Sequence, residues 1–309
     1  MYAYHDPTPI VIDLCGEDGF ALRQKALAFV EKLKVKGKES GSIEEQTYGI
    51  LAQMAIRQKL GMPIEPEDTQ SIGFDLLIPS GVKVDIKCRG GTLPFKENYM
   101  GSGGLEREAK HNFFARQLVD ERLDTDIYLM THLETPQPVS KGKTPLPGTL
   151  RQRKWILYVC GWVSKARVKN EGVYLPRGAI TEQGDRWFPY RGQEVEFYNR
   201  YLNGFRDLKE ILSIDSEDVK KDANEPMHLH LTSVDAIRIA RDLIGYGIIN
   251  KDTLDFLKTE LKIKGNVPPI LSPNQYHHLL KWLEAQGKVD KKARENLSVI
   301  MKEIEYKGD

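Results

Sequence analysis

Residues 73 to 89 read GFDLLIPSGVKVDIKCR, and this stretch decides the fold that the sequence predicts. It holds two β-like runs, residues 74 to 78 and 82 to 88, which are rich in branched and aromatic side chains. Between them lie residues 79 to 81, Pro-Ser-Gly, which favour a turn for separate backbone reasons. We therefore expect an antiparallel hairpin.

The two faces of this hairpin differ in character because side chains alternate along a strand. A three-residue loop pairs Ile78 with Val82 and, counted back along both strands, sets Asp75 opposite Asp85. One face is then apolar. The other face carries the charged side chains Asp75, Lys83, Asp85 and Lys87. A slip of one residue in the turn would break this pairing.

Two aspartates that face each other across a hairpin need a compensating charge, because like charges opposite each other destabilise a sheet by roughly 0.2 to 1 kcal/mol. A divalent cation supplies it. Mg²⁺, or Mn²⁺ in its place, prefers hard oxygen ligands and is usually held by one or two carboxylates with waters and phosphate. The alternative interpretation is an ordinary hairpin with solvated aspartates and lysines.

The order of residues in the hairpin resembles the core motif of the PD-(D/E)XK nuclease superfamily. Gly-Phe-Asp-Leu is followed, ten positions after Asp75, by Asp85-Ile86-Lys87 at the end of a hydrophobic strand. Phe74 stands where the family has its proline. The resemblance covers roughly residues 41 to 165. It implies an α/β fold with a restriction-endonuclease-like mixed sheet flanked by helices.

The resemblance also implies an acidic or amide residue on a helix just before the hairpin. Residues 42 to 60 predict that helix, with a capping serine, acids in the first turn and a Gly-Met-Pro stop. Glu45 fits by chemistry and Gln53 by the local sequence, and they lie about 80° apart around the helix. We rank Glu45 slightly ahead and keep both. The implied metal ligands are Asp75, Asp85, Ile86 and Glu45.

The implied activity is hydrolysis of phosphodiester bonds in DNA. A carboxylate-bound metal ion lowers the pKa of its water and acts as a Lewis acid on phosphate oxygen. Lys87 stabilises the transition state or orients the attacking water. The favoured interpretation of this activity is an endonuclease, and the alternatives are an exonuclease or a structure-selective nuclease of repair or recombination. A rival of another class is a non-catalytic binding or assembly protein on the same scaffold.

Composition and charge set limits on the class of protein. The chain has 309 residues, of which 40% are hydrophobic, so packed cores in two domains are expected. No apolar run approaches a membrane span, and the first residues lack the order of a signal peptide. Three isolated cysteines indicate reduced thiols. We therefore expect a cytoplasmic protein without a membrane partner.

A net charge of +1 supplies no general attraction to nucleic acid, so local basic residues must do so. Candidates lie on the hairpin and in a proline-rich loop between the predicted strands at 126 to 132 and 155 to 163. Such residues contact phosphate and confer no choice of sequence. The alternative is solvated surface. The six candidates are Lys83, Arg89, Lys141, Lys143, Arg151 and Arg153.

The coarse pattern predicts a strand at 10 to 14, a helix at 20 to 33, and a helix at 105 to 122 that carries His111. Residues 1 to 213 would form the nuclease-like domain and residues 214 to 226, which are polar and end in proline, a linker.

An internal repeat follows the predicted linker. Residues 231 to 261 and 271 to 301 match at an offset of 40, each with a Thr or Ser start, a Gly break and an Asn or Asp cap. Two helical hairpins are expected to pack together as a small all-α domain over residues 227 to 309. It is a candidate surface for a second copy or another protein.

Overall fold

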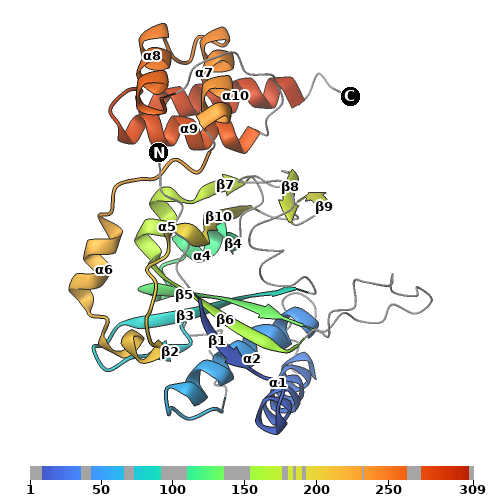
Figure 1. Cartoon of the computed structure of the whole chain (residues 1–309). Helices are drawn as coiled ribbons and strands as arrows, with labels where there is room; N and C mark the ends of the chain where they lie inside the picture. The colour runs from blue at the N-terminus through green and yellow to red at the C-terminus, as the bar shows by residue number, and fades with distance from the viewer. Residues whose placement is uncertain are drawn as a thin grey trace.

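A computed structural model of the chain describes residues 9–35, 43–65, 73–91, 110–135, 154–175, 180–183, 186–189, 193–231, 233–262 and 273–305. These residues form a mixed α/β part, from the N-terminus to about residue 223, and four C-terminal helices that lie beside it (Figure 1). The expected α/β class is therefore confirmed at this coarse level.

A five-stranded sheet forms the centre of the α/β part, with the strand order β1-β6-β5-β3-β2. The central strands β3 and β5 are parallel, and the other neighbouring pairs are antiparallel, so the sheet is mixed. The strands are β1 (Ile10–Asp13), β2 (Leu76–Leu77), β3 (Lys83–Gly91), β5 (Ile127–Glu134) and β6 (Ile156–Ser164).

The hairpin of β2 and β3 has the register that the sequence predicts. Leu76 pairs with Val84, and the backbone N–H of Ile78 donates to the carbonyl of Val82 over 3.2 Å. Gly81 has a φ of +87°, a left-handed conformation that favours glycine in this turn. The apolar face is buried as expected, through Leu76, Ile78, Val82, Val84 and Ile86.

Two helices, α1 (Glu17–Val35) and α2 (Ile43–Lys59), cover one face of this sheet (Figure 1). Acids in the first turn and bases in the last turn of α2 complement the helix dipole. The buried side of α2, which includes Leu51, Met54 and Ile56, packs into the same core as the apolar face of the hairpin. This packing fixes α2 against the strands that carry the aspartates.

A second sheet lies over the other face, and it corrects one expectation (Figure 1). We expected residues 105 to 122 to be helical, but residues 110 to 114 form strand β4, followed by the short helix α4 (Ala115–Val119). From His111 to Phe114 burial alternates, with His111 and Phe113 buried, Asn112 partly exposed and Phe114 exposed, which is the period of a strand. The strands here are β4 (Lys110–Phe114), β10 (Glu194–Tyr198) and β7 (Val173–Leu175), in that order, beside helix α5 (Lys165–Glu171).

A separate two-stranded sheet pairs β8 (Ile180–Gln183) with β9 (Arg186–Pro189). After β10 the chain forms two short 3-10 helices, η3 (Asn199–Tyr201) and η4 (Leu208–Ser213). Residues 214 to 226, which we interpreted as a linker, contain helix α6 (Ser216–Ala223). A capping box at Asp215 starts this helix, and the buried Asp222 near its end binds Arg167 on α5, so the segment packs on the α/β part.

The C-terminal helices repeat with the 40-residue offset of the sequence. They are α7 (Ser233–Gly245), α8 (Lys251–Glu260), α9 (Pro273–Ala285) and α10 (Lys291–Glu305). Gly247 and Gly287 both have a positive φ at the break, and the Asn250 and Asp290 side chains cap the following helices. Side chains of all four helices share one hydrophobic core.

None of the helices in the described part of the chain combines the length and the apolar composition needed to span a lipid bilayer.

Candidate active site on the β2–β3 hairpin

The hairpin brings Asp75, Asp85 and Lys87 together. Asp75 directly precedes β2, and its backbone N–H donates to the carbonyl of Val84 over 2.8 Å, which sets it beside Asp85 on the neighbouring strand. Asp85 and Lys87 lie on one face of β3, and the distance from Lys87 Nζ to Asp85 Oδ2 is 2.7 Å. Asp75 is buried, whereas Asp85 and Lys87 are partly exposed. A carboxylate pair with an adjacent ammonium results.

The carboxylate of Asp75 is held from two sides. Gln53 Nε2 on α2 donates to Oδ1 over 2.7 Å, and the backbone N–H of Ile86 donates to Oδ2 over 2.7 Å. Of the two helix candidates, Gln53 therefore makes the hydrogen bond to Asp75, while Glu45 is exposed in the first turn of α2. The crossing of α2 over the sheet decides this, and the sequence does not display it.

Arg57 is a residue of the site that the sequence reasoning missed. It lies four residues after Gln53 on α2, so both side chains project from one side of the helix. Its Nη2 donates to the backbone carbonyl of Asp75 over 2.5 Å, and its Nη1 donates to that of Pro63 over 3.3 Å. The spacing of four from Gln53 is the signal that could have found it. Two residues of α2 thus hold Asp75.

Tyr128 on β5 supports the other half of the site and was also missed. It pairs with Asp85 in the parallel register, and Lys87 Nζ lies 5.5 Å from the centre of its ring. The ring of Phe113 packs on it with a centroid distance of 4.7 Å. Burial, with the nearby charge of Asp85, raises the pKa of Tyr128, so the phenol is neutral. Lys87 therefore lies between a carboxylate and a neutral aromatic ring.

The predicted nucleic-acid contacts are only partly described by the structure. The side chain of Lys83 pairs with Asp124, and its backbone N–H donates to Asp126. Arg89 continues the charged face of β3 two residues after Lys87, and its Nη1 donates to the backbone carbonyl of Lys110 over 3.0 Å. The four candidates Lys141, Lys143, Arg151 and Arg153 lie outside the described residues.

Buried polar residues of the second sheet pair with one another and with strand β5 of the central sheet. Lys110 on β4 forms a buried ion pair with Glu196 on β10, at 2.6 Å. Nearby, both ring nitrogens of His111 lie 2.8 Å from oxygen atoms, Oδ1 of Asn199 and the carbonyl of Thr131. Burial lowers the pKa of His111 to about 4, and burial lowers the pKa of His132 well below its usual range. Both rings are therefore neutral at physiological pH.

A neutral ring at His111 fixes the direction of its hydrogen bonds. An imidazole with one proton donates from only one nitrogen, and the carbonyl of Thr131 can only accept. Nε2 therefore carries the proton and Nδ1 accepts. The amide of Asn199 satisfies this when its nitrogen faces Nδ1. His111 is thus a structural residue of the core.

The donor set of the hairpin fits Mg²⁺ or Mn²⁺ by its chemistry. Asp75 and Asp85 supply hard carboxylate oxygens, the ligand type that Mg²⁺ prefers. The described residues contain no group of three or more His, Cys, Asp or Glu side chains that could enclose a metal ion. Two carboxylates with water and phosphate are the usual magnesium arrangement, whereas an all-protein cage is not.

Comparison with known proteins found no matching family model, no similar curated protein and no similar solved structure.

Proposed function

We propose that this chain is a divalent-metal-dependent nuclease that hydrolyses phosphodiester bonds in DNA as an endonuclease, on a core of the PD-(D/E)XK type. The observation that supports this proposal is that the Asp75 carboxylate accepts from the backbone N–H of Ile86, the residue after Asp85, while Lys87 Nζ lies 2.7 Å from Asp85. Hydrolysis of a phosphodiester needs an activated water and positive charge around the phosphate, and these three side chains can supply both.

Each residue of the site has a distinct part in this proposal. Asp75, Asp85 and the carbonyl of Ile86 would hold the metal ion, which lowers the pKa of its water when bound. Lys87 faces the developing negative charge on the phosphate. Gln53 fixes the direction of the Asp75 carboxylate through its 2.7 Å hydrogen bond, so it and not Glu45 is the helix residue of the site in this proposal. An exonuclease or structure-selective nuclease would use the same groups.

Recognition of DNA is assigned in this proposal to residues around the site and to the helical accessory domain. Arg89 lies on the same face of β3 as Lys87, where it can contact a neighbouring phosphate. Residues 227 to 309 would serve as a docking surface for a second copy of the chain or for a protein partner.

A non-catalytic scaffold is the second candidate, and a specific observation favours it. The charge of Asp85 is compensated by Lys87, and both oxygens of Asp75 accept hydrogen bonds from Gln53 and Ile86. The two carboxylates are therefore held by groups of the protein without a metal ion. In that case the chain binds nucleic acid or assembles with partners and cleaves nothing.

The deciding experiment offers the full chain linear, circular and single-stranded DNA and RNA, with Mg²⁺ or Mn²⁺. The nuclease proposal expects cleavage by the wild type and its loss in Asp85→Asn and Lys87→Gln. Matched controls are Asp255→Asn and Lys258→Gln, which remove the same charges from an ion pair on α8. Cleavage that survives in both site variants removes the proposed site. A wild type that leaves every substrate intact supports the scaffold.

Binding of Mn²⁺ to the protein without nucleic acid gives a second, independent reading. Titration calorimetry should show one weak site in the wild type and in Asp255→Asn, and a clear loss of affinity in Asp85→Asn, because that variant removes one of the two carboxylates. Equal affinity in all three proteins would separate metal binding from the hairpin.

A further inference from the structure

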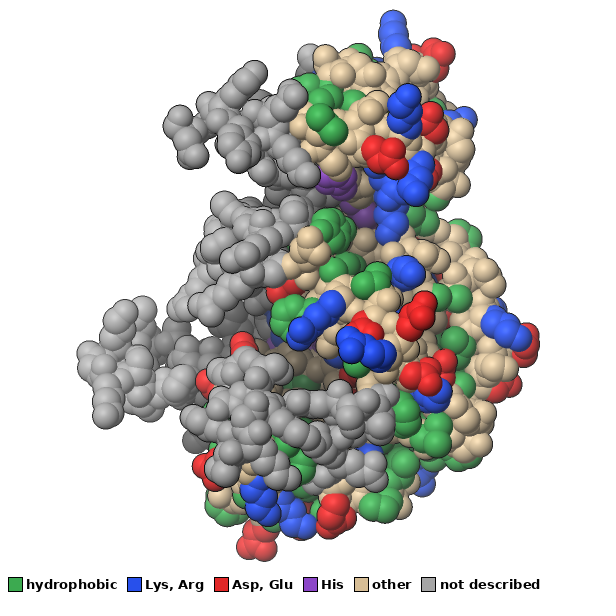
Figure 2. Space-filling view, turned by 180° about the vertical axis from the view of Figure 1, so that it is seen from behind, with side chains coloured by type: hydrophobic (Ala, Val, Ile, Leu, Met, Phe, Trp, Pro, Cys, Tyr) green, Lys and Arg blue, Asp and Glu red, His purple; other side chains and the backbone are tan. Residues whose placement is uncertain are grey.

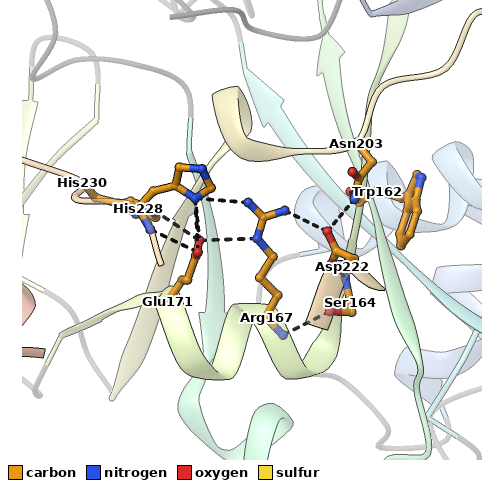
Figure 3. A network of polar contacts seen from close by, with 8 residues as sticks. All are labelled: Trp162, Ser164, Arg167, Glu171, Asn203, Asp222, His228 and His230. Carbon is orange, nitrogen blue, oxygen red and sulfur yellow. Dashed lines mark hydrogen bonds and ion pairs between the residues drawn. The ribbon is translucent and has the colours of Figure 1, made fainter. Parts of the chain in front are cut away.

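Three histidines lie where the C-terminal helices meet the α/β part. His228 and His230 belong to the segment that connects α6 to α7, and His278 lies on α9, which packs against β7. Figure 2 shows histidine side chains at this boundary, and Figure 3 shows His228 and His230 beside Glu171 of α5. We call this group, with Glu171 and Tyr201, the histidine seam.

Glu171 anchors the seam from the α/β side. Its Oε1 accepts a hydrogen bond from the backbone N–H of His228 and lies 3.1 Å from Nδ1 of that ring. Burial alone would raise the pKa of Glu171, but contacts with His228, His230 and Arg167 outweigh it and lower the pKa to about 2. Arg167 is in turn tied to Asp222 at 2.8 Å, so this side of the seam is rigid and anionic at Glu171.

His230 and His278 form the centre of the seam and are both buried. Their ring centroids are 4.8 Å apart, and His230 stacks on Tyr201 at 4.5 Å. Among the described residues, none of their four ring nitrogens has a hydrogen-bond partner. The closest acid, Oε2 of Glu171, is 3.8 Å from Nε2 of His230, which is too long for a hydrogen bond.

The groups around the two rings are mostly cationic. On the α/β side these are Arg167 on α5 and Arg200 on η3, whose guanidinium lies 4.8 Å from the ring of Tyr201. From α9 comes Lys281, whose Nζ donates to the carbonyl of Lys169 over 3.2 Å. Burial, with the charge of Arg294, lowers the pKa of Lys281 to about 8. Glu171 opposes these cations, and the ring of His228 stacks on Tyr201 with a centroid distance of 4.3 Å.

Protonation of both central rings is therefore disfavoured in the closed arrangement. Burial, more than any charge, lowers the pKa of His230 to about 4 and that of His278 well below its usual range. One proton on His230 would gain from Glu171, but a second proton on His278 would lie 4.8 Å from the first ring and beside Lys281. In water both rings would take protons near pH 6.5.

We propose that the histidine seam is an acid-sensitive latch, in which protonation of His230 and His278 releases α9 and the helices packed with it from the α/β part. The hydrophobic core of the C-terminal helices is separate from the cores of the α/β part, so the two can part without opening either core. The latch is closed at neutral pH and opens in mild acid.

The direction and the steepness of this pH dependence follow from the difference in proton binding between the open and the closed form. The open form takes protons near pH 6.5 and the closed form only near pH 4 or below, so closure is fully favoured above pH 6.5 and weakens as the pH falls. Each histidine raises the ratio of open to closed molecules about tenfold per pH unit in this window, and both together about a hundredfold.

The test uses the full chain at pH 7.5, 6.5, 5.5 and 5.0. Small-angle X-ray scattering should show a larger radius of gyration at pH 5.0 to 5.5, while far-ultraviolet circular dichroism stays constant. Hydrogen exchange, corrected for intrinsic rates, should rise more than tenfold in β7 and on the side of α9 that packs against β7 in the closed form. An unchanged radius and unchanged exchange would overturn the latch. Loss of helical signal in step with the expansion would also overturn it, because that is acid unfolding.

Variants separate the seam from other buried histidines. The double variant His230→Phe with His278→Phe keeps two rings and removes both protons, so it should stay closed at pH 5.0. His278→Phe alone should open with half the dependence on pH. His132→Phe is the matched control, a buried histidine of β5 away from the seam, and should open like the wild type. A double variant that opens over the same pH range as the wild type refutes the latch.

Discussion

Gln53 on α2 donates a hydrogen bond from Nε2 to Oδ1 of Asp75 over 2.7 Å. The donor is a neutral amide, so it binds the carboxylate without adding a second negative charge. A hydrogen bond to a charged group contributes about 1.5 to 3 kcal/mol. This contact links the helix that covers the sheet to the strand pair that carries the site.

Replacing the Gln53 amide by a carboxylate should make the thermal stability of the protein depend on a divalent metal ion. In Gln53→Glu two carboxylates meet where the wild type has a hydrogen bond, so we expect the melting temperature to fall at pH 7.5. Added Mn²⁺ should raise it by several degrees more in this variant than in the wild type, because a divalent cation neutralises the pair. Scanning calorimetry with and without Mn²⁺ measures both effects.

The control for that experiment is Gln53→Glu combined with Asp85→Asn. Removal of the second aspartate should reduce the effect of Mn²⁺ on the melting temperature. If Mn²⁺ stabilises the combined variant as much as the single one, Asp85 is not near the bound ion.

Arg57→Met should destabilise the fold as well as the site. The change leaves the buried carbonyl of Asp75 without its donor, which costs about 1 to 3 kcal/mol, and also removes the hydrogen bond to Pro63, an exposed residue. Urea denaturation should show a loss of about 1 to 3 kcal/mol. The exposed Arg206→Met is the comparison and should change stability by less than about 0.5 kcal/mol.

Tyr128 offers a test of how Lys87 is positioned, and it rests on the proposed nuclease activity. Tyr128→Phe keeps the ring 5.5 Å from Lys87 Nζ and should retain most of the activity. Tyr128→Leu removes the ring and should lower kcat about fivefold with little change in KM, because about 1 kcal/mol of cation–π interaction is lost. Equal kcat values for the two variants would show that the ring does not position the lysine.

Asp222→Asn should release helix α6. Asp222 accepts from Arg167 at 2.8 Å and from the backbone N–H of Ser164 at 2.7 Å, and all three groups are buried. Breaking a buried ion pair by removing one charge costs about 3 to 5 kcal/mol. Thermal denaturation should show this loss. The exposed pair of Lys220 and Glu217 on the same helix is the control, and Lys220→Gln should have almost no effect.

Ionisation of Glu194 on β10 should lower the free energy of unfolding above neutral pH. Burial, with the charge of Glu196, raises its pKa to about 7. The folded form therefore binds a proton that the unfolded form releases above pH 4.5, so this contribution falls as the pH rises through 7. Glu194→Gln should be about 1 to 2 kcal/mol more stable than the wild type at pH 8, allowing for solvent screening, and equal at pH 4.

The control for this prediction is the exposed Glu225→Gln, which should behave like the wild type at both pH values. A Glu194→Gln protein whose unfolding free energy differs from the wild type by the same amount at pH 4 and pH 8 would show that the carboxyl does not titrate between them.

The elements that the sequence predicted well are those fixed by short-range signals. The turn at residues 79 to 81 and the alternation on either side of it determined the pairing of Leu76 with Val84. The glycine breaks and the Asn250 and Asp290 caps determined where the repeated helices begin and end. Each of these signals lies within a few residues of the feature that it sets.

The features that the sequence did not predict depend on partners far away along the chain. Strand β4 exists because β10, more than eighty residues later, pairs with it. The choice of Gln53 over Glu45 depends on how α2 crosses the sheet, which no local pattern records. In the sequence Asp222 is one of several acids in a polar segment, and its importance depends on Arg167, which lies 55 residues earlier in the chain. His230 and His278 are brought together by the packing of α9.

The 40-residue repeat is a pseudo-symmetric pair whose members have diverged at one important position. His278 on α9 corresponds to Arg238 on α7, which forms an ion pair at 3.2 Å with Asp235 on its own helix. The first helices of the two copies span equivalent residues, but His278 lies 4.8 Å from His230 at the boundary with the α/β part, whereas Arg238 pairs with Asp235 on its own helix. The same position of the repeat therefore contributes to attachment in one copy and to the stability of its own helix in the other.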